Sequence, residues 1–423
     1  MSIFALLSLL VTIGALFSFL SFRVLKLPTS IGTMILSLGT AALLLVGGAR
    51  APFVHAEAQR IVGGIDFNAV VLHGMLSLLL FAGALQLDLP QLGREKLSVT
   101  TLSIGATALS TIFVAVLFDY ALRLLGIHIS VMSALLFGAL ISPTDPIAVL
   151  EMLRRVGAPA ALETQLAGES LFNDGVGAVI FLALVTASSG GAAPSVGGFL
   201  LSLTLKAGGA ILLGGGLGYV TYRVLRLVDS YRVEVLLTLA LAMGGYALAD
   251  ALGVSAPLEA VTAGLLVSGR ARMLAMSENT REHVDRFWEL VDDMMNVVLF
   301  LLLGLELLVL PVERRFVFAG LLAIPVVLAA RWLSVVIPVG VLNVFHKHVP
   351  GTVAVLTWGG LRGALAVALA LSVPRGQGLE RNMLLVATYV VVVFSILVQG
   401  LTISPLLRHL KLSGVTEPVH LNA

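Results

Sequence analysis

The sequence contains no cysteine among its 423 residues, and only 12% of its residues are charged. The absence of cysteine excludes disulfides, thiolate nucleophiles and cysteine-ligated metal sites. Aromatic residues make up 7% of the chain, whereas hydrophobic residues reach 58% and the mean hydropathy is +1.03. Such hydropathy excludes a water-soluble domain. The formal net charge of +2 requires no nucleic-acid partner. The composition therefore predicts a protein of the lipid bilayer.

Long apolar segments recur along the whole chain, and about 20 apolar residues span a bilayer as one helix. The predicted spans cover residues 3–22, 31–48, 67–87, 97–118, 131–150, 163–188, 197–225, 233–252, 256–268, 291–310, 316–342, 352–372 and 382–406. The sequence thus predicts an all-α polytopic membrane protein with about 13 transmembrane helices, in which residues 1–423 form one domain.

The connections between the spans orient the chain. With the N-terminus outside, the inside connections and the tail hold 16 Lys and Arg residues, counting Arg223 at the inner end of the seventh span, against 7 in the outside connections. Because basic residues accumulate on the cytoplasmic side, we expect the N-terminus outside and the C-terminus in the cytoplasm. The chain ends about 17 residues after the last span, so we expect no soluble regulatory domain.

Residues 269–293 form a charged connection in which Phe287, Trp288 and Leu290 are interleaved with charges that include Asp292 and Asp293. This pattern predicts an amphipathic helix on the cytoplasmic surface. Residues 49–66 are expected to form a polar outside loop.

Other polar residues near the predicted span ends are expected to be solvated: Glu259, Glu306, His128, His346 and His348. His73 is expected in the core. The spacing Gly214-x₃-Gly218 predicts close helix packing.

Two predicted spans are interrupted near their middle. Residues 142–146 are Ser-Pro-Thr-Asp-Pro, and the two prolines remove backbone donors and disfavour helix at the residues before them. Residues 357–363 are Thr-Trp-Gly-Gly-Leu-Arg-Gly, a glycine-rich interruption around Arg362. Such breaks persist in a membrane only where protein or a wet cavity satisfies the freed backbone groups.

The two broken spans are seven apart in order, so they cross the membrane in opposite directions. This arrangement predicts inverted repeats with two discontinuous helices that cross at the midplane. Spans 4–6 and 11–13 then match each other, and residues 67–188 and 291–406 are expected to contribute a six-helix transport bundle. The helix ends inside the membrane carry partial charges, which Asp145 and Arg362 are suited to neutralise.

The sixth span carries four polar residues within an apolar stretch: Glu169, Ser170, Asn173 and Asp174. Their i, i+4 spacing predicts one stripe facing a common space. Carboxylates at this depth cost roughly 2.5 kcal/mol or more each, and they usually mark an ion or proton path. This stripe therefore predicts a transport protein.

Oxygen ligands suit small monovalent cations, and no histidine or cysteine competes for a softer metal there. We predict a Na⁺ site at Asp174, Asp145, Thr144 and Ser170, and we place Asn173 with this ion- and proton-binding group. A carboxylate removed from water takes up a proton readily. Asp174 is therefore expected to hold either a proton or a cation.

A buried arginine requires a carboxylate partner. Arg331 lies near the middle of the eleventh span. Glu169 is the first choice as its partner, with Arg362 as the competing arginine for that glutamate. A buried pair of this kind is expected to hold two spans together without titrating.

These residues resemble the sodium/proton antiporters of the monovalent cation:proton antiporter-1 family. The resemblance rests on Gly-Glu-Ser-Leu-Phe-Asn-Asp-Gly at 168–175, on Ser-Pro-Thr-Asp-Pro at 142–146 and on Gly-Gly-Leu-Arg-Gly at 359–363, in matching order and spacing. It implies that Asp174 binds the cation and the proton, that Thr144 and Asp145 assist, and that Glu169 pairs with an intramembrane arginine.

The resemblance also implies a homodimer in which a mobile bundle moves beside an interface domain, giving elevator-like alternating access. Electrogenic relatives carry Asp-Asp where this chain has Asn173-Asp174, so the asparagine favours electroneutral one-for-one exchange. The short tail favours a prokaryotic inner-membrane protein. No cofactor is expected beyond the transported Na⁺ or Li⁺ and H⁺.

Two alternatives differ in ion or in class. K⁺/H⁺ exchange is the alternative within transport, because oxygen ligands do not define ion size. An intramembrane aspartyl protease is the remote alternative, since Asp145 and Asp174 lie 29 residues apart. Neither aspartate lies in a Gly-x-Gly-Asp sequence, so we expect no enzymatic activity.

Overall fold

The computed structural model of the protein describes residues 3–27, 29–47, 52–189, 196–269, 274–310, 313–343, 349–374, 378–410 and 412. These residues form helices throughout, and the isolated β-bridge between residues 145 and 361 is the sole extended pairing in that part of the chain. Nine helices in the described ranges are long and apolar enough to cross a bilayer. The predicted all-α polytopic membrane fold is confirmed.

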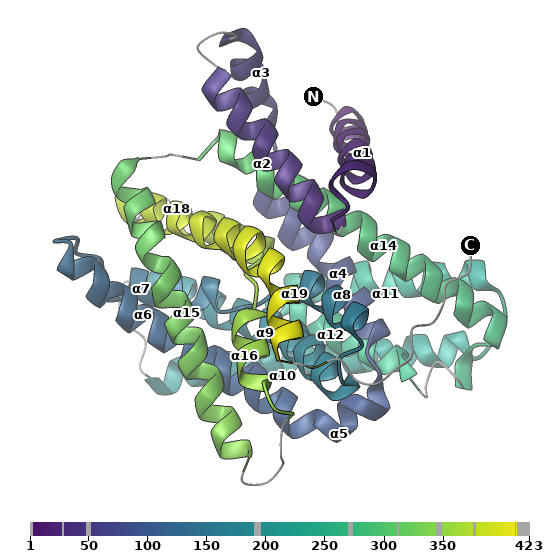
Figure 1. Ribbon diagram of the computed structural model, residues 1–423. Coiled ribbons are helices and arrows are strands. Elements are labelled where there is room, and N and C mark those ends of the chain that lie inside the picture. Colours follow the sequence, from purple (N-terminus) through teal and green to yellow (C-terminus); the bar gives the residue numbers. More distant parts are fainter. Residues whose placement is uncertain are drawn as a thin grey trace.

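The helices follow one another in the order shown in Figure 1. Their bounds are α1 Ile3–Leu20, α2 Thr29–Gly47, α3 Pro52–Gly63, α4 Leu76–Gln86, α5 Leu89–Thr100, α6 Thr107–Leu124, α7 Val131–Ile141, α8 Ile147–Val156, α9 Ala160–Ser189, α10 Val196–Leu225, α11 Tyr231–Ala251, α12 Ala256–Val267, α14 Glu278–Leu305, α15 Arg314–Leu342, α16 Thr352–Trp358, α17 Ala364–Leu371, α18 Gly378–Phe394 and α19 Gly400–His409. Short wider or tighter helical turns join several of them, at residues 21–25, 69–75, 101–106, 306–308 and 395–399.

The predicted spans correspond to these helices. Nine match the membrane-length helical segments. The other four correspond to the short α12, to α14 and to the broken pairs α7–α8 and α16–α17. The largest difference in a boundary is in the tenth span, which was expected from residue 291, whereas α14 already begins at Glu278. The fourth span was expected to start at residue 97. The helical segment starts at Leu89 instead, because Asp88 caps it by accepting from Gln91 N and Pro90 supports its first turn.

Two groups of helices pack around the middle of the molecule. In one group, α6 packs against α7 and α15, α15 packs against α18, and α7 packs against α9 and α17. In the other group, α12 packs against α4, α10 and α11, and α14 packs against α2 and α4. Figure 1 shows α8, α16 and α19 near the centre, and contacts between α8 and α19 and between α16 and α19 join them.

The helix α10 faces outward along much of its length. Leu200, Leu201, Leu205 and Leu212 are exposed large apolar side chains on it. Its other face approaches α12 so closely that a Cβ at Gly214 would lie 2.6 Å from Glu259 O, and one at Gly218 would lie 3.2 Å from Ala263 O. The prediction of close packing at this glycine pair is confirmed.

Residues 278–293 are helical, but they are not a separate surface helix. They form the first half of α14, which begins after the N-cap Ser277 and continues to Leu305. Trp288 is 1% exposed, and its ring centroid lies 4.8 Å from that of Phe81. The buried part of the apolar face therefore packs into the protein. Of the predicted connection, residues 270–273 lie outside the described ranges.

Three expectations about solvation are wrong. Glu259 and Glu306 are buried, at 0% and 7% exposure, because α12 and the turn after α14 lie inside the helix packing. His73 is instead half-exposed and lies 3.7 Å from Asp250 Oδ2. The region 49–66, expected as a loop, contains α3. His346 and His348 lie outside the described residues.

Candidate ion-binding site

The two broken helices meet at a backbone contact. The helix α7 ends at Ile141 and α8 begins at Ile147, while α16 ends at Trp358 and α17 begins at Ala364. Between these ends, Asp145 N donates to Leu361 O at 2.8 Å. The extended segments therefore satisfy part of each other's backbone, as a break at membrane depth requires.

The Asp145 carboxylate lies at the start of two helices. Its Oδ1 accepts from Ile147 N at 3.1 Å, the first amide of α8. A Cβ on Gly363, just before α17, would lie 2.5 Å from Asp145 Oδ2. A glycine at 363 lets the two segments approach this closely. Since helix N-termini carry partial positive charge, both helix starts stabilise a negative group at this position.

The Arg362 side chain lies at the end of α7. Its Nη1 donates to Ser142 O at 2.6 Å and to Pro143 O at 3.0 Å. These carbonyls lie just beyond the last helical residue, where the partial charge of a helix is negative. Arg362 is 2% exposed, and its Nη2 has no hydrogen-bond partner within the described ranges. The arginine of one broken helix therefore caps the other.

A second buried arginine joins α15 to α9 and α16. Arg331 donates from Nη1 to Glu169 Oε1 at 2.6 Å and from Nη2 to Glu169 Oε2 at 3.0 Å. Its Nε and Nη2 also donate to Leu356 O, near the end of α16. The side chains are 3% and 0% exposed, respectively. Of the two arginines that the sequence left open as partners of Glu169, the structure pairs it with Arg331.

Two residues of α9 hold the broken helix at Thr144. Asn173 Oδ1 accepts from Thr144 N at 3.2 Å, and Asn173 Nδ2 donates to Thr144 Oγ1 at 2.8 Å. Ser170 Oγ donates to Thr144 O. The backbone amide and the backbone carbonyl of Thr144 are therefore both bound by side chains of α9.

A cavity of about 180 Å³ opens beside this crossing point. Among its lining residues are Thr144, Asp145, Ser170 and Asp174, the four predicted ligands of the cation. Asp145 and Asp174 are partly accessible, whereas Thr144 and Ser170 are buried. The Asp174 carboxylate forms no hydrogen bond to any residue that the structure describes. The structure thus brings all four residues to one space.

The polar stripe of α9 divides between two faces. Ser170 and Asp174 line the cavity, but Glu169 and Asn173 do not. Glu169 points to Arg331 and Asn173 to Thr144. The expectation that all four share one space is wrong, because adjacent residues on a helix differ by about 100° in direction. Asn173 lies behind the cavity and positions Thr144.

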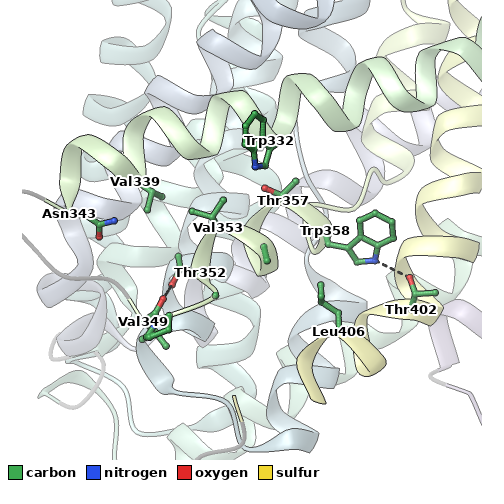
Figure 2. Close-up of a pocket in the computed structure, with 13 residues that line it drawn as sticks. Trp332, Val339, Asn343, Val349, Thr352, Val353, Thr357, Trp358, Thr402 and Leu406 are labelled. Atoms are coloured by element: carbon green, nitrogen blue, oxygen red, sulfur yellow. Dashed lines mark hydrogen bonds between the residues drawn. The ribbon is translucent and has the colours of Figure 1, made fainter. Parts of the chain in front are cut away.

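A larger groove of about 820 Å³ lies elsewhere, between α15, α16 and α19 (Figure 2). Trp332, Val353 and Leu406 line it, and Trp358 Nε1 donates to Thr402 Oγ1 at 2.9 Å at its edge. Among the residues that the structure describes, no carboxylate lines this groove. The smaller cavity is therefore the candidate for cation binding.

The sequence did not single out two further residues of the cavity, Asp292 and Asn296 on α14. Asp292 was placed among the charges of a surface helix. The available signal was Asn296, an amide four residues further on inside an apolar run that begins at Met294.

Two crossed, broken helices beside a carboxylate-lined cavity within a polytopic α-helical protein define a secondary transporter of cations. The family description "Sodium/hydrogen exchanger, transmembrane" matches residues 6–409. The chain therefore belongs to the sodium/hydrogen exchanger family, and the resemblance drawn from its motifs is confirmed. The family exchanges Na⁺ for H⁺, so the predicted class of function is confirmed. This is a family of transporters, so the comparisons favour transport over the protease alternative.

Similar proteins extend over nearly the full chain. The Na⁺/H⁺ antiporter NhaP of Pseudomonas aeruginosa is 43% identical over 406 residues, covering 95% of each chain. The Na⁺/H⁺ antiporter NhaH of Halobacillus dabanensis is 33% identical over 393 residues, covering 92% of this chain and 93% of the relative. The sodium proton antiporter MjNhaP1 of Methanocaldococcus jannaschii, solved at pH 8, has a TM-score of 0.75 at 20% identity. That match covers 96% of this chain and 98% of the other, and it supports the fold.

Proposed function

We propose that the protein exchanges one Na⁺ or Li⁺ for one H⁺, with Asp174 as the group that takes each in turn. The observation that carries this proposal is the cavity shared by Asp174, Asp145, Thr144 and Ser170 at the crossing of the two broken helices. Carboxylate, hydroxyl and carbonyl oxygens are hard ligands, which suit a small alkali cation.

The two aspartates of the cavity have different surroundings. Asp145 accepts an amide hydrogen bond and lies at two helix starts, so its charged form is stabilised. Asp174 has no such donor among the described residues and is free to bind a proton or a cation. Asn173 has no proton to lose, and Glu169 is held by Arg331. One carboxylate then exchanges one proton for one monovalent cation, and turnover moves no net charge.

Alternating access follows from the position of the crossing point. The proposed moving part is the six-helix bundle of spans 4–6 and 11–13, which contains α6, α7–α8, α9, α15, α16–α17 and α18–α19. The Glu169–Arg331 pair connects α9 to α15 within this bundle. An elevator-like displacement would carry the cavity between the two sides without breaking that buried pair.

The proposed setting is the inner membrane of a prokaryote, with the N-terminus outside, the C-terminus cytoplasmic and two copies in a dimer. The excess of basic residues on one side supports the orientation. The resemblance to the family supports the dimer. Cysteine labelling from outside cells tests the orientation cleanly, because the chain contains no cysteine of its own. A single cysteine at Ser2 is expected to react with an impermeant reagent.

Transport in proteoliposomes tests the exchange and the ion. With an imposed pH gradient, Na⁺ and Li⁺ are expected to dissipate the gradient, whereas K⁺ is not. The matched control is Asp174→Asn in the same vesicles. Dissipation by K⁺ as efficient as that by Na⁺ would replace the proposal with K⁺/H⁺ exchange.

A further inference from the structure

Asp292 and Asn296 line the ion cavity from α14, a helix that belongs to neither of the broken pairs. They are four residues apart on one helix, so their side chains project from the same face. Both line the cavity that contains Asp145 and Asp174. The helix α14 itself packs mainly against α2 and α4, whereas Asp145 and Asp174 lie on the crossing segment and on α9. The cavity is therefore lined by carboxylates from three elements: the crossing segment, α9 and α14.

The side chain of Asn296 has an unused acceptor. Asn296 is 4% exposed, and its Oδ1 has no hydrogen-bond partner in the part of the chain that the structure describes. A buried carbonyl oxygen without a partner costs about 1–3 kcal/mol, and such oxygens are rare in folded proteins. Both residues line the ion cavity, and the Asn296 side-chain amide donates a hydrogen bond to the Asp292 carboxylate, which leaves Oδ1 free. A cation is a partner that satisfies both.

The lining of the cavity also includes a charge of the opposite sign. Arg154 also lines the cavity, and its Nε lies 3.9 Å from Glu163 Oε2 with the arginine side chain 65% exposed. A long, exposed ion pair neutralises little of that guanidinium charge. Arg154 thus adds positive charge to the lining of the cavity, and Asp292 adds negative charge to the same lining.

We propose that Asp292 and Asn296 form a second cation subsite, through which Na⁺ passes on its way to Asp174. The subsite offers one carboxylate and one amide carbonyl oxygen, both hard ligands for a small monovalent cation. It rests on the proposed function, because a cation subsite matters only if Asp174 is the destination. Asp292 is therefore an affinity determinant of transport, and the exchange step itself stays at Asp174.

The test is Asp292→Asn, measured as Na⁺/H⁺ exchange in proteoliposomes across a range of Na⁺ concentrations. The KM for Na⁺ is expected to rise about tenfold, the size expected for the loss of one charge-assisted contact, while kcat changes by less than twofold. Calorimetric titration of the purified variant with NaCl is expected to show a similar rise in Kd. Asn296→Ala is expected to raise KM by a smaller factor.

Asp293→Asn is the matched control. Asp293 is the next residue, is exposed and does not line the cavity. The KM of Asp293→Asn for Na⁺ is therefore expected to equal that of the parent. Asp292→Glu keeps the charge and is expected to retain a KM near that of the parent, which separates the loss of charge from a general loss of folding.

Parental KM and Kd in Asp292→Asn would overturn the subsite. A fall in kcat at unchanged KM would overturn it as well, because a subsite on the route acts on affinity. If KM for Na⁺ rose equally in Asp292→Asn and Asp293→Asn, the cause would be a general effect of surface charge, and the subsite would be overturned. Failure of the underlying proposal has a separate signature, which is Na⁺-driven proton movement that persists in Asp174→Asn.

Discussion

The Glu169–Arg331 pair is the interaction whose removal we expect to destabilise the protein most. In the structure Arg331 holds both oxygens of Glu169, at 2.6 and 3.0 Å, and both side chains are almost completely buried. In Glu169→Gln, one oxygen is replaced by an NH₂ group that faces the Nη groups of the arginine. One charge-assisted hydrogen bond is lost and two donors oppose each other.

The magnitude follows from the charge that remains. Breaking a buried pair on one side typically costs about 3–5 kcal/mol, because the surviving ion stays desolvated and unpaired. Arg331 keeps its two hydrogen bonds to Leu356 O, but this acceptor is neutral and does not balance the charge of the arginine. We therefore expect a cost within this range for Glu169→Gln. Replacing both residues by apolar ones, as in Glu169→Met/Arg331→Met, is expected to restore part of the stability, because no unpaired charge is then buried.

The assay is thermal unfolding of the purified protein in detergent, read as loss of the folded species in size-exclusion chromatography. Glu169→Gln is expected to unfold at a clearly lower temperature than Asp174→Asn, which is the matched carboxylate-to-amide change on the same helix. If Glu169→Gln were as stable as the parent while Arg362→Ala collapsed, the reasoning would be refuted. Arg362, which caps α7 through Ser142 O and Pro143 O, would then be the structural arginine.

Three further predictions concern transport. Asp174→Asn is expected to abolish exchange in proteoliposomes while leaving a folded protein, because an amide cannot release a proton. Electrical recording on a supported membrane is expected to show no net charge moved per turnover, and a sustained current that scales with membrane potential would contradict one-for-one exchange. Exchange rates measured across pH are expected to pass through a maximum: at low pH protons outcompete Na⁺ at Asp174, and at high pH no proton is available for the return step. An exchange rate that keeps rising toward low pH or toward high pH would contradict competition at one carboxylate.

The positions of the helices were largely predictable, since an apolar run of bilayer length requires a helix whatever surrounds it. The breaks at 142–146 and 357–363 were predictable for a similar reason, because proline and clustered glycine act on the local backbone. The charged first turns of α14 were predicted as a helix, but as a separate one on the surface. Their continuity with the tenth span was missed, because it depends on tertiary packing such as the burial of Trp288 against Phe81.

The site residues were identified from residue type and depth, whereas their partners depend on the fold. Spacing of i, i+4 determines which side chains of α9 share a direction, but not what lies in that direction. The tertiary structure decided that Glu169 meets Arg331 and that Asn173 holds Thr144. It also brought Asp292 from α14 to the cavity of Asp174.

The sequence by itself therefore determined the bilayer spans, the two breaks and the acidic stripe, because each follows from local hydropathy and backbone chemistry. The direction of each polar side chain was decided only by tertiary structure. A buried charge takes the partner that packing brings within hydrogen-bond reach. Such partners can lie far apart in the chain, as Glu169 and Arg331 do with a separation of 162 residues.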